Sequence, residues 1–208
     1  MNPAREYGRC RRNLLSFTSA CDTTATMGLF RKHKTPEELG ATLYEALRTG
    51  MASGARLSVA VFLEGLGRTS TDFDEQYLGE IMTALMFGGL MAIERSAPSR
   101  VAEQITAGMK AEFFQHLAEQ GASAVQKAEW ENVVADRFLN YRKCLEDYEG
   151  FEPPWKLGRE FYWILVGQED HNAMAIKATT MYLLDARDVC QDLLNEFGPT
   201  LIIEKQNR

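Results

Sequence analysis

An uninterrupted apolar run in the middle of the chain constrains the fold most. Residues 81–93, IMTALMFGGLMAI, contain no charged side chain over 13 residues. This is shorter than the roughly 20 residues that a helix needs to span a bilayer, so the run predicts a buried helix and no transmembrane segment. Its apolar positions cover more than one face, and Gly88-Gly89 would let another backbone approach closely. We therefore expect a central helix that is surrounded by the other elements.

Helical periodicity accounts for most of the chain on either side of this run. Apolar residues recur three or four positions apart, which is the spacing of a helix that buries one face. Such helices are predicted to begin near Thr35, Ser99, Ala122 and Gln168. A short apolar helix is predicted from Trp155 to Val166, and Gly198-Pro199 should end the last helix. For residues 57–63 we favour a helix over a strand, because no partner strand is evident.

The predicted fold class is all-α. A single-domain bundle of six or seven helices over residues 35–208 fits a chain of 208 residues, which is long enough for one well-buried core. The polar and proline-rich stretch at residues 149–155 is a candidate subdomain break. An apolar content of 45% and a charged content of 25% are ordinary for a soluble globular protein.

Charge separates the first 34 residues from the rest. Residues 1–34 carry seven basic and two acidic residues, whereas residues 35–208 carry 16 basic and 27 acidic residues, a net charge of −11. Thr35-Pro36-Glu37-Glu38 follows directly and is typical of a helix start, because Thr35 and Glu38 can form a capping box. We therefore predict a basic, disordered tail over residues 1–34 and a folded domain after it.

The origin of this tail stays open on sequence grounds. Residues 1–26 are rich in Arg, Ser and Thr and poor in acids, which suits a leader, a disordered tail or a mis-called start before Met27. Leu29, Phe30, Arg31 and Lys32 could make weak contact with an anionic membrane surface, although we favour a solubilising role for them.

Two histidines provide the candidate polar site. Glu112 and His116 are four residues apart on one helical face, a spacing that can present two ligands to a metal. Asp170 and His171 lie near the start of the last helix and could complete a mixed carboxylate and imidazole site. We favour the simpler interpretation, in which these residues form a solvated pair and a helix cap, and we expect no cofactor. No phosphate-binding glycine motif occurs in the chain.

The remaining features favour a protein that acts by contacting other proteins. An acidic domain argues against nonspecific nucleic-acid binding, and four cysteines without a CxxC pair suit a reducing cytoplasm. A cluster of aromatic residues could form either a partner-binding patch or part of the core. Its members are Phe151, Trp155, Tyr162 and Trp163. We therefore expect a non-enzymatic cytoplasmic protein that binds proteins or self-associates as a homo-oligomer. The alternative is a helical enzyme, or a small-ligand or metal-binding protein, with a pocket between helices.

Overall fold

The computed structural model describes residues 34–53, 56–67, 75–146, 154–166 and 171–203. These residues form seven helices and no strand, which confirms the all-α class and the helix predicted near residues 57–63. The helices are α1 (Pro36–Ser53), α2 (Val59–Gly65), α3 (Glu75–Ser96), α4 (Ser99–Glu119), α5 (Ala124–Leu145), α6 (Trp155–Val166) and α7 (Ala173–Ile203). Of the tail predicted over residues 1–34, residues 1–33 lie outside the described residues, as do most of residues 149–155.

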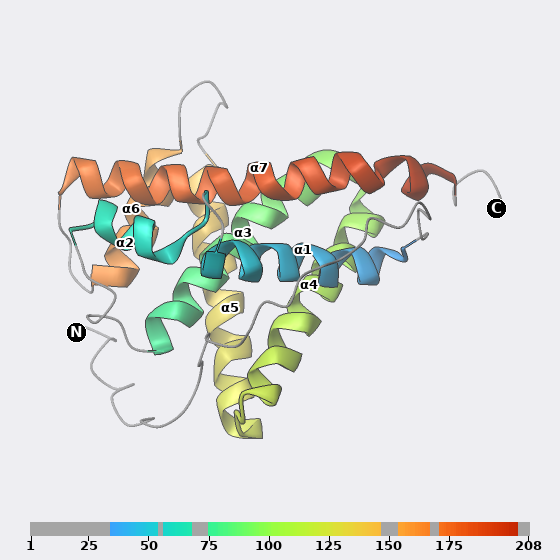
Figure 1. The fold of residues 1–208 in the computed structure, drawn as a ribbon, viewed down its shortest axis with the longest axis horizontal. Coiled ribbons are helices and arrows are strands. Elements are labelled where there is room, and N and C mark those ends of the chain that lie inside the picture. Colours follow the sequence, from blue (N-terminus) through green and yellow to red (C-terminus); the bar gives the residue numbers. More distant parts are fainter. Residues whose placement is uncertain (1–33, 54–55, 68–74, 147–153, 167–170, 204–208) are drawn as a thin grey trace.

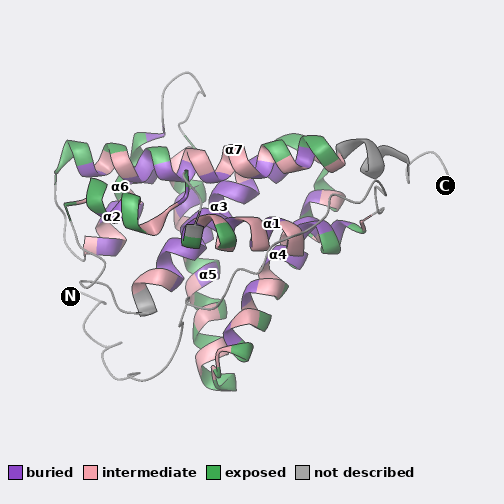
Figure 2. Ribbon diagram, viewed as in Figure 1, coloured by how far each residue is buried: buried purple, intermediate pink, exposed green. Residues whose placement is uncertain are grey.

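Helix α3 occupies the centre of the molecule, as its apolar sequence predicts. Every residue from 81 to 90 is buried (Figure 2). The backbones of α3 and α7 meet at Gly88, where an added Cβ would lie 2.7 Å from the carbonyl oxygen of Leu183. The segment Tyr77–Ser96 is long and apolar enough to cross a membrane by length and composition alone, and 78% of its 18-residue apolar window is buried inside the structure. A core helix has the same properties.

The other helices are arranged along α7, the longest helix, which extends across the molecule (Figure 1). Helix α1 is antiparallel to α7, and the ammonium of Lys34 before α1 lies 5.4 Å from the ring centroid of Phe197 in α7. Helices α2 and α6 lie near the start of α7, while α4 and α5 project away from it as a helical pair (Figure 1). This arrangement leaves the N-terminal part of α7 beside α6.

The start of α1 is the capping box that the sequence predicts. The backbone N–H of Thr35 donates to Glu38 Oε2 at 2.9 Å, and the backbone N–H of Glu38 donates to Thr35 Oγ1 at 3.2 Å. Ser123 and Gln126 form a second capping box at the start of α5. These local bonds satisfy backbone donors that have no partner within the first turn of a helix.

Helix α7 differs from the prediction at both ends. It begins at Ala173 rather than near Gln168, because the side-chain oxygen of Asn172 accepts from the backbone N–H of Ala175 at 3.1 Å and caps the helix there. It also passes through Gly198 and Pro199 to Ile203. The prediction that Gly198-Pro199 ends this helix was therefore wrong. A proline removes one hydrogen bond from a helix and can bend it without ending it.

Two buried tyrosines should respond differently to removal of the hydroxyl group. Tyr182 donates to the carbonyl oxygen of Leu57 at 2.7 Å, whereas the Tyr141 hydroxyl has no hydrogen-bond partner among the described residues. Tyr182→Phe leaves a buried carbonyl unsatisfied and should lower the free energy of unfolding by about 1–3 kcal/mol. Tyr141→Phe should leave it unchanged or raise it. Urea unfolding followed by circular dichroism measures both, and equal losses in the two variants would contradict this expectation.

Candidate functional site

The structure describes three of the four aromatic residues that the sequence proposes as an interface. Trp155 begins α6 and is 41% exposed, while Trp163 on the same helix is half-buried. Tyr162 is only 4% exposed, so its ring faces the interior. Phe151 lies outside the described residues. On this part of the chain, Trp155 is the aromatic side chain most accessible to a partner.

Trp155 lines a groove between α6 and α7 that has a volume of about 530 Å³. Helix α6 contributes Trp155, Lys156 and Arg159 to it. The other lining residues are His171, which precedes α7, and Ala173, Met174, Ile176 and Lys177 of α7. Concave and mainly apolar sites of this size are common binding sites in proteins.

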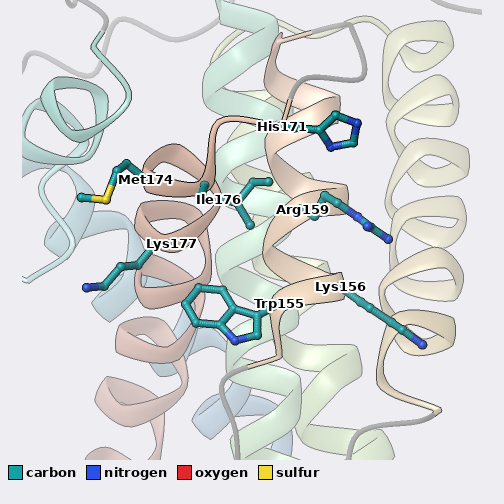
Figure 3. A pocket seen from close by; sticks show the side chains of 8 residues that line it. Trp155, Lys156, Arg159, His171, Met174, Ile176 and Lys177 are labelled. Atoms are coloured by element: carbon teal, nitrogen blue, oxygen red, sulfur yellow. The ribbon is translucent and has the colours of Figure 1, made fainter.

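The groove has an apolar middle with cationic side chains on both sides. Figure 3 shows the indole of Trp155 and the side chain of Ile176 between the two helices. Lys177 extends outward on the α7 side, and Lys156 and Arg159 extend outward on the α6 side (Figure 3). Met174, beside Lys177, is 71% exposed and adds a flexible apolar side chain at the edge.

Helical spacing explains how α6 supplies this surface. Lys156, Arg159 and Trp163 are three and four residues apart and share one face, while the opposite face buries Leu157 and Phe161. The guanidinium carbon of Arg159 lies 4.8 Å from the ring centroid of Trp163, a cation–π geometry that holds the charge on this face of α6. The ring of His171 contacts Trp163 from the start of α7, with the centroids 6.4 Å apart.

Close contact between α6 and α7 sets the shape of the groove. The hydroxyl of Thr179 donates to the carbonyl oxygen of Gly158 at 2.8 Å. A Cβ added at Gly158 would lie 2.8 Å from the Cβ and 2.9 Å from the Cα of Thr180. Since Gly158 and Thr180 are both buried, the two helices are in direct contact at this point. The groove residue Arg159 is adjacent to Gly158 in the chain.

The histidines predicted as metal ligands lie in different surroundings. His116 packs against Tyr44 with ring centroids 6.2 Å apart, whereas His171 is exposed and contacts Trp163. Glu112 is half-buried on the same helix as His116, and Asp170 lies outside the described residues. No group of three or more His, Cys, Asp or Glu in the described part of the chain is arranged to hold a metal ion. Burial and the neighbouring Arg48 lower the pKa of His116, which favours its neutral form.

The two described cysteines lack the properties of catalytic nucleophiles. Both are free, and Cys190 is buried in the core. Burial raises the pKa of Cys190 to about 12. Burial, together with the charge of Glu160, also raises the pKa of Cys144. Because the thiolate is the reactive form, both groups are largely unreactive thiols at neutral pH.

Sequence reasoning missed Lys156, Arg159, Met174 and Lys177 as site residues. A signal for the first two was present, because they flank the predicted interface residues Trp155 and Trp163 on a helical face. Met174 and Lys177 belong to another helix, and periodicity alone does not indicate which helices pack together.

Comparison with known proteins adds no relative: neither a family model, nor a curated protein, nor a solved structure matches this chain.

Proposed function

We propose that this chain is a non-enzymatic cytoplasmic protein that acts by binding another protein through the α6–α7 groove. The observation that carries the proposal is the exposed apolar pair at the groove: Trp155 is 41% exposed and Met174 is 71% exposed. Tryptophan is among the side chains most enriched at energetically important positions of protein interfaces. An exposed tryptophan beside a concave surface is therefore a suitable centre for such an interface.

Two further properties support a protein partner. The groove of about 530 Å³ can accept a few side chains of a bound segment, so it would form the core of a larger interface. Both described cysteines are free thiols, which suits the reducing cytoplasm expected from the sequence. A second copy of the chain is one form that the partner could take, in line with the self-association expected from the sequence.

The alternative function, an enzyme or metal site between helices, stays a prediction. It requires Glu112, His116, Asp170 and His171 to converge. The two histidines contact different aromatic rings, and Asp170 lies outside the described residues. No observation in the described part of the chain favours this alternative over protein contacts.

Site-specific photo-crosslinking tests the proposed function. A benzophenone amino acid is introduced at Met174 in cells that make the full chain, and a parallel sample carries it at Leu139 of α5. Leu139 is a suitable control because it is 54% exposed and lies outside the groove lining. We expect a discrete protein adduct from position 174 that position 139 does not produce and that Trp155→Ser abolishes.

The size of the adduct identifies the partner. An adduct of twice the mass of this 23.5 kDa chain would indicate a second copy, and any other discrete mass would indicate a different protein. The absence of an adduct from position 174, or the same adducts from both positions, would contradict the proposal. Trp155 is 41% exposed, so Trp155→Ser loses buried apolar surface and should melt below the wild type. The variant and the wild type are therefore compared at a temperature where thermal melting shows both to be folded.

A further inference from the structure

We infer that the α6–α7 groove binds an acidic segment of a different protein, in which carboxylates flank one apolar anchor residue. This inference rests on the proposed function and specifies the partner by its chemistry. It follows from the charges around the groove, from their positions on its two sides and from its apolar middle.

The charge of the groove is opposite to that of the domain. Residues 35–208 have a net charge of −11, yet the described lining of the groove contains three cationic side chains, one histidine and no carboxylate. Clustering of one sign of charge around a concave surface raises the local concentration of ligands with the opposite sign. The groove is therefore suited to an anionic ligand.

Two of these cations are not paired within the described part of the protein. Arg48, Arg137, Arg142 and Arg187 each form an ion pair with a carboxylate. Arg159 instead stacks on Trp163, and neither Arg159 nor Lys177 has an ion pair with a described carboxylate. Within the described part of the chain, no carboxylate engages these two charges.

The positions of the cations predict where the bound segment carries its acidic side chains. Lys177 lies on the α7 side and Arg159 on the α6 side, with Trp155 and Ile176 between them (Figure 3). A segment lying across the groove would meet a cation before and after its apolar contact. The matching sequence has an aliphatic or aromatic residue with Asp or Glu on both sides.

The apolar and charged contacts should contribute differently to binding. Burial of the anchor against Trp155 and Met174 supplies most of the affinity, as is usual for residues at the centre of an interface. Exposed ion pairs contribute only about 0.2–1 kcal/mol each, and they mainly increase the association rate and select the partner. The charges therefore distinguish an acidic segment from other apolar segments.

Selection from a random peptide library tests this inference directly. Phage-displayed random short peptides are selected on the full-length protein. The selected phage are then depleted on Trp155→Ser protein, which removes peptides that bind without the groove tryptophan. The peptides that remain are the groove-dependent sequences. We expect these sequences to carry Asp or Glu on both sides of one aliphatic or aromatic residue. Groove-dependent sequences without acidic residues, or no groove-dependent sequence at all, would overturn the inference.

A charge-reversal pair measures the contribution of the cations. R159E/K177E should weaken binding of the selected peptide by about tenfold or more, measured by fluorescence anisotropy with a labelled peptide. R95E/R100E is the matched control, since it makes the same change in net charge at exposed cations of α3 and α4. The control should stay close to wild type. Equal weakening by both double variants would show an effect of overall charge and overturn the inference.

The two proposals can fail separately. A Trp155-dependent adduct at position 174, together with charge-independent peptide binding, would leave the protein-contact function intact and exclude an acidic partner. Sedimentation velocity adds a further distinction, because a dimer that R159E/K177E abolishes would place a second copy in the groove and also exclude a different protein. Loss of both the adduct and groove-dependent peptides would overturn both proposals.

Discussion

Gly40→Ala should lower the free energy of unfolding by about 3 kcal/mol or more, because α1 and α4 are packed backbone to backbone at this residue. A Cβ at position 40 would overlap the carbonyl oxygen of Ile105 and lie 2.6 Å from the backbone nitrogen of Met109. The contact is reciprocal: a Cβ at Gly108 would lie 2.7 Å from the Cα of Glu37. Since backbone atoms cannot rotate away as side chains do, the helices must separate.

Helix propensity opposes this loss but is smaller. Alanine in a helix interior is favoured over glycine by about 1 kcal/mol, so a glycine with free space around it would gain stability from the same change. Gly65→Ala is the matched control, because its Cβ would lie at an ordinary 3.5 Å from the Cβ of Ala178. Urea unfolding should show a large loss for Gly40→Ala and little or none for Gly65→Ala. A loss below about 1 kcal/mol at Gly40 would mean that the helices separate easily.

Local signals explain which parts of this fold could be predicted. The apolar run of residues 81–93 has too few polar positions to face water on any side. The central position of α3 in the fold therefore followed from the composition of this run. The first helix began at the predicted capping box because Thr35 and Glu38 are close in sequence and need no other part of the chain. Each of these predictions depended on residues within one helix.

Contacts between distant segments were harder to predict for a physical reason. Glycine at positions 40 and 108 shows that a close approach is allowed, but not that these two helices approach each other. The same limit applies to Lys156 and Lys177. Only the packing of α6 on α7 places these two residues at one groove. Tyr162 illustrates a related ambiguity: the spacing of an aromatic residue suits either an interface or the core, and this side chain is only 4% exposed.

A substitution at the contact between α6 and α7 should affect both the stability of the protein and the binding of a peptide in the groove. Gly158→Ala would introduce a Cβ 2.9 Å from the Cα of Thr180, and it would disturb the hydrogen bond from Thr179 to the carbonyl oxygen of Gly158. Gly158 and Thr180 are both buried, so the steric strain is relieved chiefly by moving α6 and α7 apart. We expect a loss of stability of about 2–4 kcal/mol. The same separation would widen the groove and move Arg159 away from Lys177.

Comparison with Gly40→Ala separates these two effects. Both variants insert one methyl group into a close helix contact, but Gly40 lies in the α1–α4 contact, whereas Gly158 is adjacent to the groove residue Arg159. At a temperature where both proteins are folded by circular dichroism, Gly158→Ala should weaken binding of the selected peptide by about tenfold, and Gly40→Ala should leave it unchanged. If both variants bind equally well, the groove does not depend on the spacing of α6 and α7. If both bind equally poorly, loss of stability rather than groove geometry controls binding.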